Sequence, residues 1–174
     1  MLPRLPVLFT ALLLTVSLRA ADSAPAPLLT VGTANRNVSF SPDAFAAISH
    51  AEVTATDPHA KASHRYAGVP VRALLDRTDV PSGKDIRGAA QQLAVLVRGS
   101  DDYAVVFSLA ELDPGYGKRG VLLCDREDGA PLDDHYGPLR LVVPGDDFAA
   151  RWVRNVMAIE VVTVGTVVPR TAKH

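Results

Sequence analysis

The stretch "GPLRLVVPGDDFAARWVRNVMAIEV", residues 137–161, has the apolar content of core strands but carries arginines and the chain's single tryptophan. Alternation in "LRLVV" predicts a strand with three apolar side chains on one face and Arg140 on the other. Pro144-Gly145 then turns the chain, and "DDFAARWVRNV" follows as a loop or a single helical turn. Burying an unpaired guanidinium is costly, so Arg140 needs a carboxylate, a carbonyl, solvent or a ligand.

Two explanations of this stretch remain open from spacing alone. In the first, Arg140 pairs with an aspartate of the neighbouring loop, which carries Asp146 and Asp147, and Trp152 fills the core. In the second, Arg140 and Trp152 line a ligand pocket, because rigid β domains commonly build their sites from strand ends and loops. Arg151 and Arg154 pose the same question.

The rest of the chain alternates short strands with brief helices. "LLTVG" and "NVSF" around the turn "TANR" predict an N-terminal hairpin, and Ser41 followed by Pro42 predicts a helix start. Pro70 opens a second predicted helix, and Ser108 with Glu111 forms a capping-box pattern. Further strands are expected at "EVTAT", "QLAVLVRG", "YAVVFS", "GVLLCD", "LRLVV" and "VMAIEVVTV". We therefore predict one α+β domain, mainly β, over residues 28–168.

The N-terminal segment has the layout of a secretory signal peptide. Arg4 precedes an apolar run over residues 5–18, and small residues follow near Ala20. The alternative, an uncleaved anchor helix, is disfavoured because the run is shorter than the roughly 20 residues of a membrane span. We predict a signal peptide over residues 1–20 with cleavage at about 20–24, a flexible leader over 21–27 and a tail over 169–174. The mature protein is then periplasmic or secreted.

Charge and cysteine content narrow the function classes. Removing Arg4 and Arg19 with the signal peptide leaves 16 basic and 19 acidic residues, a net charge of −3. This balance gives no electrostatic reason to bind nucleic acid. Cys124 is the only cysteine, so no internal disulfide forms, and its place at the end of an apolar run favours a buried thiol over a nucleophile.

Several segments resemble, in order, the molybdopterin-binding domain of sulfite-oxidase-type oxidoreductases. They are "YAGVPVRALLDRTDVP", "VRGSDDYAVVFSLAELDPG", "LLCDREDGAPL", "YGPLRLVVPGD" and "RWVRNVMAIEV". The resemblance covers roughly Leu28 to Val162 and implies a mixed α+β domain around a pterin pocket. It also extends to small exported members without the cysteine, which bind free reduced pterins and report them to a membrane signalling protein.

One departure from the enzymes of that family bears on function. The resemblance implies a cysteine ligand to molybdenum between the strand "EVTAT" and the segment "YAGVP". Here that interval reads "DPHAKASHR", and Cys124 lies far downstream. Asp57 and His59 are the alternative ligands that the interval offers, although a soft thiolate is the bond expected for the metal. A reduced pterin is therefore favoured as the ligand over the molybdenum cofactor.

A pterin ring needs an aromatic platform, an acceptor carboxylate and donors for its carbonyl side. Near the matching loops the sequence supplies rings, carboxylates and donors for these three roles. The predicted ligand-binding residues are Asp57, His64, Arg98, Asp101, Asp102, Tyr103, Arg140, Asp146 and Trp152. His59 and His64 flank the loop without the cysteine, so one of them is a candidate for the pocket, whereas "DDHYG" with His135 reads as a solvated turn. No catalytic residue and no metal site is predicted.

The sequence therefore predicts an exported, non-catalytic pterin-binding protein that acts as a sensor or accessory subunit. Its expected partner is the periplasmic domain of an inner-membrane signalling protein or enzyme subunit. Two alternatives stay open: a molybdenum-cofactor oxidoreductase with unfamiliar metal ligands, and a structural domain that kept the fold and lost its ligands.

Overall fold

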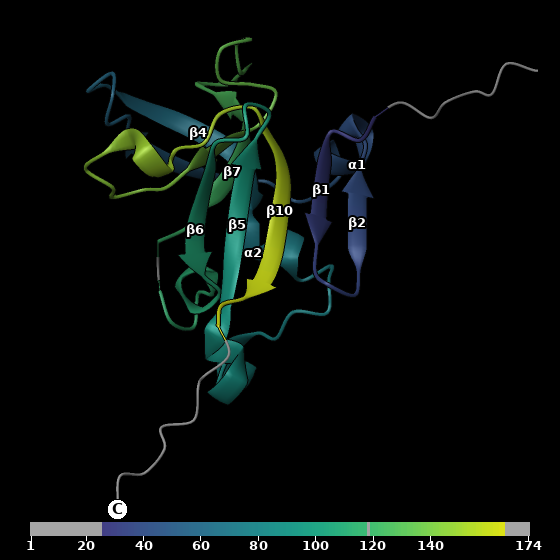
Figure 1. Cartoon of the computed structure of the whole chain (residues 1–174). Coiled ribbons are helices and arrows are strands. Elements are labelled where there is room, and N and C mark those ends of the chain that lie inside the picture. Colours follow the sequence, from purple (N-terminus) through teal and green to yellow (C-terminus); the bar gives the residue numbers. More distant parts are fainter. Residues whose placement is uncertain (1–25, 118, 166–174) are drawn as a thin grey trace, which may run out of the picture.

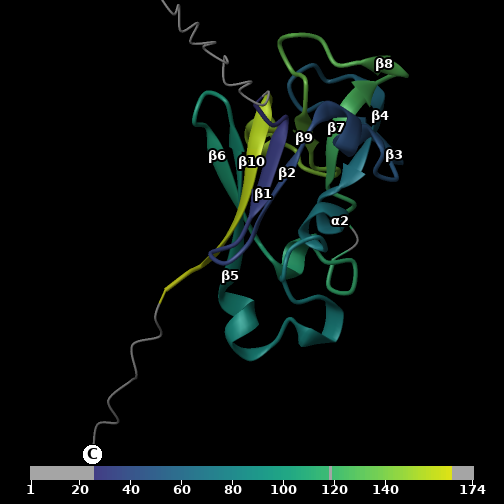
Figure 2. The ribbon, with the colours of Figure 1, turned by 90° about the vertical axis from the view of Figure 1, so that its right-hand side faces the viewer.

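The computed structural model describes residues 26–117 and 119–165, so the predicted signal peptide, most of the leader and the tail lie outside the described residues. In this part of the chain, two five-stranded sheets pack face to face around one core (Figure 1). Figure 2 shows them as separate layers, with β1 and β10 in one and β4 and β7 in the other. This mainly-β arrangement with short helices confirms the predicted α+β class.

The first sheet has the strand order β2-β1-β10-β5-β6. Its strands are β2 (Asn37–Phe40), β1 (Leu29–Gly32), β10 (Val156–Thr163), β5 (Leu93–Gly99) and β6 (Ala104–Ser108). β1 is parallel to β10, while β10 and β5 are antiparallel. Val97 of β5 lies opposite both Ile159 and Val105, and all three are buried. The alternation of apolar residues seen in the sequence therefore puts one face of this sheet into the core.

The second sheet has the order β3-β4-β7-β8, and β9 also pairs with β7. Its strands are β3 (Ala51–Thr56), β4 (Ser63–Pro70), β7 (Leu122–Glu127), β8 (Ala130–Pro131) and β9 (Arg140–Val142). All five residues of "LRLVV" are buried, including Arg140, because β9 has protein on both sides. The predicted alternation of a core face and a polar face is therefore wrong for this strand.

The N-terminal hairpin forms as predicted, with β1 and β2 antiparallel. Helix α1 (Pro42–Ala46) begins after Ser41, whose hydroxyl oxygen accepts the Ala44 N–H at 3.2 Å. Helix α2 (Val71–Leu75) begins after Pro70, and its two leucines are fully buried. Short 3₁₀ turns occupy Gly83–Asp85, Gly88–Gln92, Ala110–Leu112 and Ala149–Arg151. Within the described ranges, no helix is long and apolar enough to cross a bilayer.

The pairing of β4 with β7 explains why the "YAGVP" segment has a glycine at position 68. β4 begins at Ser63, so only a short turn remains of the interval that separates it from β3. At Gly68 a Cβ atom would lie 2.2 Å from the Leu123 carbonyl oxygen and 2.4 Å from the Cα of Cys124. This close approach coincides with a register shift between Ala67 and Gly68, so the pairing of β4 with β7 requires glycine here.

Candidate functional site

Five segments that are distant in sequence enclose a cavity of about 300 Å³ at one end of the two sheets. They are the turn after β3, the β5–β6 turn, the segment before β9, β9 itself and the β9–β10 loop. The lining residues are His59, Asp101, Tyr103, His135, Tyr136, Arg140, Ala149, Ala150, Trp152, Val153 and Arg154. A volume of this size accommodates a small aromatic ligand.

A buried ion pair between Arg140 and Asp57 supports the floor of the cavity. The Arg140 Nη2 donates to Asp57 Oδ2 at 2.7 Å, and both side chains are 3% exposed. Asp57 Oδ1 accepts the backbone N–H groups of His59 and Ala60, at 2.7 and 3.0 Å. Burial by itself raises the pKa of Asp57, but these amides and the Arg140 guanidinium outweigh burial and hold that pKa below its usual value. Asp57 is therefore an ionised anchor that joins the β3–β4 turn to β9.

The Arg140 guanidinium keeps two donors that nothing in the described chain accepts. Its Nε and Nη1 atoms are buried and have no hydrogen-bond partner. The Glu127 Oε2 lies 3.8 Å from Nη1, which is attractive electrostatically but too long for a hydrogen bond. Unsatisfied donors on a buried cation are unusual in native proteins and call for a physical explanation.

Aromatic rings surround this guanidinium. The Arg140 Cζ lies 3.9 Å from the Tyr136 ring centre, 5.1 Å from that of Trp152 and 5.8 Å from that of Tyr66. Tyr66 and Trp152 contact each other edge to face at 5.5 Å, and both are buried. Tyr136 is only half-buried and covers the guanidinium from the segment before β9. The floor of the cavity is thus a cation between aromatic faces.

The walls of the cavity are tied together by specific polar contacts. The Trp152 indole N–H donates to the Val143 carbonyl at 3.2 Å, and the Tyr103 hydroxyl donates to the Ala150 carbonyl at 2.7 Å. At the rim, the Arg154 Nη1 lies 2.8 Å from the His135 Nε2. The cavity therefore has an aromatic lining, a cation at its floor and a polar edge.

Arg151 does not face the cavity as a free cation. It forms two hydrogen bonds to Asp146, at 2.8 and 2.6 Å, and a third to Glu111 at 2.9 Å. Arg119 also contacts Asp146, at 3.0 Å. The hydrogen bonds that Arg151 donates to Asp146 raise the pKa of Arg151 further above its ordinary value. This pairing fixes the β9–β10 loop. It also means that Asp146 partners Arg151 and Arg119. One of the two explanations left open by the sequence paired Arg140 with an aspartate of this loop; the partner is instead Asp57, 83 residues away.

The structure brings together four of the nine predicted ligand-binding residues at the cavity, and Asp57 lies directly behind them. Those four are Asp101, Tyr103, Arg140 and Trp152. The other predicted residues have different surroundings. Arg98 lies 3.9 Å from Glu160, Asp102 occupies an exposed turn, Asp146 binds Arg151, and His64 contacts Glu127 and Asp128. Whether any of the nine binds a ligand stays a prediction.

Among the polar and aromatic lining residues, sequence reasoning missed His135 and Tyr136, and it left Arg154 open. His135 is exposed, as a turn residue should be, but the turn folds over the cavity. The sequence did contain an indication of Tyr136, because this aromatic residue directly precedes the "GPLRL" motif that carries Arg140. His59, which the sequence left as one of two candidates, lines the cavity.

Cys124 is not one of the residues that line the cavity. It lies in β7, fully buried in the core, with Arg140 opposite it in the β7–β9 register. Burial raises the pKa of its thiol well above the ordinary value. The thiol is therefore protonated and inert at neutral pH, as the sequence predicted for a buried cysteine.

Comparisons with known proteins agree with this architecture. The family described as "Oxidoreductase molybdopterin binding domain" matches residues 28–166. Among solved structures, the chain is similar to the sulfane dehydrogenase SoxCD from Paracoccus pantotrophus, with a TM-score of 0.59 and 18% identity. That match covers 76% of this chain and 37% of the SoxCD chain, so the protein spans well under half of that structure's length. No curated protein matches the sequence significantly.

Proposed function

The chain belongs to the oxidoreductase molybdopterin-binding domain family, and from this premise we propose that it is an exported, non-catalytic protein that binds a free reduced pterin. In this proposal it works as a sensor or accessory subunit for a membrane protein. Export rests on the signal-peptide pattern of residues 1–20. The site rests on the cavity beside Arg140.

The observation that carries the proposal is the pair of unsatisfied donors on Arg140. A pterin presents a carbonyl oxygen at the edge of its ring, and this acceptor matches one of the two unpartnered N–H positions of the guanidinium, Nε or Nη1. The flat ring fits between Trp152 and the β5–β6 turn, which carries Tyr103. To reach the donors, the ligand displaces the Tyr136 ring, which now stacks at 3.9 Å on the guanidinium.

The family also implies a molybdenum atom on the pterin, and the donor set here does not fit it. The metal needs a soft thiolate, and the chain's only cysteine is buried in β7, away from the cavity. In the β3–β4 turn, Asp57 is committed to Arg140 and two amides, which leaves His59 as an exposed nitrogen ligand. These residues fit the pterin part of the cofactor and not its metal.

A second candidate is an oxidoreductase that holds the molybdenum cofactor through unfamiliar ligands. The family match favours it, as does the position of His59 on the cavity wall. Metal analysis separates the two candidates: protein purified from the periplasm carries molybdenum in stoichiometric amount only in the second.

The β9–β10 loop offers a physical route from ligand to partner. Ala149 and Ala150 line the cavity, while the preceding residue, Phe148, is 80% exposed. A ligand that shifts this backbone moves an exposed aromatic side chain, which is a typical anchor at protein interfaces. We propose that the partner is the periplasmic domain of an inner-membrane signalling protein or enzyme subunit, and that it distinguishes the apo from the pterin-bound loop. By linkage, the partner must change pterin affinity by the same factor.

Calorimetric titration tests the function directly. Metal-free protein is titrated anaerobically with tetrahydropterin, with its oxidised counterpart, and with guanine as a bicyclic control. Saturable binding of one equivalent of the reduced pterin supports the proposal. Absence of pterin binding, or turnover of a sulfite or sulfoxide with an electron donor, overturns it. The variant Phe148→Ser tests the proposed contact with the membrane protein. It should keep the pterin affinity of the parent protein and should no longer capture the membrane partner.

A further inference from the structure

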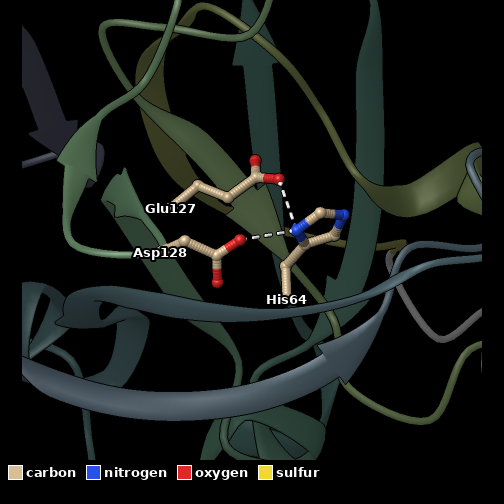
Figure 3. A group of neighbouring side chains, drawn as sticks. All are labelled: His64, Glu127 and Asp128. Atoms are coloured by element: carbon tan, nitrogen blue, oxygen red, sulfur yellow. Dashed lines mark hydrogen bonds and ion pairs between the residues drawn. The ribbon is translucent and has the colours of Figure 1, made fainter.

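A second group of polar side chains lies on the β4–β7 pair, apart from the residues that line the cavity. His64, Glu127 and Asp128 converge so that one ligand atom from each lies within 4.8 Å of the others (Figure 3). His64 Nδ1 is 2.8 Å from Asp128 Oδ2 and 3.2 Å from Glu127 Oε1. Figure 3 shows the imidazole turned so that Nδ1 faces both carboxylates and the other ring nitrogen points away.

The fold holds these three residues in place. β4 pairs with β7 so that Tyr66 lies opposite Glu127, which puts His64, two residues earlier on the same face, diagonally beside that carboxylate. Asp128 follows β7 in the left-handed region, with φ of 50°, at the turn into β8. Its Oδ1 accepts the Arg65 N–H at 2.9 Å. That bond aims Oδ2 at the imidazole, as outer contacts orient metal ligands.

The charge balance of the group leaves room for a cation. Two carboxylates face one imidazole, and the nearby Arg140 is paired with Asp57 at 2.7 Å and lies 3.8 Å from the other Glu127 oxygen, Oε2. The hydrogen bond to Asp128, with the charge of Glu127, raises the pKa of His64. The two carboxylates therefore attract positive charge to this group. A proton on His64 supplies that charge, and a bound metal cation can supply it instead. The side chains are partly open to solvent, at 28% for His64 and 25% for Glu127, so an ion can enter.

We propose that His64, Glu127 and Asp128 bind a divalent transition-metal cation, with Zn²⁺ as the probe. One imidazole and two carboxylates are a borderline ligand set that suits zinc, and water completes the four-coordinate site. Bonds of about 2.0–2.2 Å to zinc separate tetrahedral ligands by about 3.3–3.6 Å. The observed 2.8 and 3.2 Å separations need only a small side-chain movement to reach that spacing.

Metal and proton compete for His64 Nδ1 in this site. Zinc binding therefore releases a proton at a pH below the raised pKa of His64, and the apparent affinity increases with pH until His64 is neutral. The groups that face His64 are Asp128, Glu127 and, farther away, Asp57, with the Tyr66 ring at 6.1 Å.

The test is a zinc titration of tag-free, chelator-treated protein in a non-coordinating buffer, followed by calorimetry. Loss of an outer contact alone typically weakens metal binding about 10–100-fold, so loss of a ligand in His64→Gln or Asp128→Asn should weaken it by at least about 100-fold. The matched control is His50→Gln, because His50 also faces a carboxylate, Asp125, at 3.3 Å, but only one. This control should leave zinc affinity within about twofold.

Circular dichroism melts without metal show that each variant is folded, and Co²⁺ absorption reports the coordination number independently. The proposal is overturned if no saturable site is found at micromolar zinc, or if His64→Gln binds zinc as tightly as the parent protein. It is also overturned if His50→Gln removes the site. Zinc binding in Tyr103→Ala, a variant of the cavity wall, should match the parent protein, so failure of the pterin site does not affect the outcome.

Discussion

The substitution Arg140→Lys separates the two roles that the structure gives this side chain. The ion pair to Asp57 uses one nitrogen, Nη2, at 2.7 Å, and a lysine ammonium can replace it. Lysine cannot replace Nε and Nη1, the buried donors that have no partner in the described chain, or the flat face stacked on Tyr136. The variant therefore keeps the charge pair and removes the donors assigned to the pterin.

The magnitudes follow from these contacts. Loss of the stacked guanidinium costs about 1–2 kcal/mol of unfolding free energy, a decrease of about 2–8 °C in Tm for a domain of this size. Loss of one charge-assisted hydrogen bond to the ligand costs about 1.5–3 kcal/mol, which is roughly 10–150-fold in Kd. Pterin binding should therefore weaken by at least about 10-fold while the domain stays folded, because the ion pair to Asp57 survives.

Anaerobic calorimetry with tetrahydropterin measures the binding, and thermal melting without ligand measures the stability. Arg98→Lys is the matched control, because Arg98 lies in the adjacent sheet, pairs loosely with Glu160 at 3.9 Å and does not line the cavity. It should bind pterin within about twofold of the parent protein. If Arg140→Lys also binds within about threefold, the unsatisfied donors do not contact the ligand and the proposed site is wrong.

Three further predictions follow from other contacts. Cys124→Ser should lower stability by about 1–2 kcal/mol in urea melts, because the thiol is buried in the core, and should leave pterin affinity unchanged; loss of binding in a folded variant would contradict the site. Because the folded pKa of Asp57 is depressed, its contribution to stability is present above the unfolded value of about 3.9 and is lost as the pH falls through the folded pKa. Asp57→Asn should therefore flatten the acid limb of stability against pH, and an unchanged slope would show that Asp57 is not the coupled group. Tyr136→Ala should bind pterin at least as fast as the parent protein in stopped-flow fluorescence, because the ring covers the donors, and a tenfold slower association would refute its displacement.

The sequence by itself determined the local elements and the family. Ser41 and Pro42 fix the start of α1 through a side-chain acceptor and a preset φ, contacts that span only a few residues. The hairpin of β1 and β2 follows from its short polar turn, and the apolar alternation of β5 and β10 follows from the pleat. The missing cysteine between β3 and β4 was equally plain, because it needs only an ordered comparison of motifs.

Only the tertiary structure decided which charges meet. Arg140 and Asp57 lie 83 residues apart and pair because β9 and the end of β3 belong to one sheet, while the nearer Asp146 turns to Arg151 and Arg119. The sequence made His64 a reasonable candidate for the pocket, because it flanks the loop between β3 and β4. The register of β4 on β7 instead places its imidazole against Glu127 and Asp128. Backbone sterics and periodicity act over a few residues and are legible in the sequence. The partner of a long charged side chain depends on how loops from different strands converge, and that is fixed only when the sheets pack.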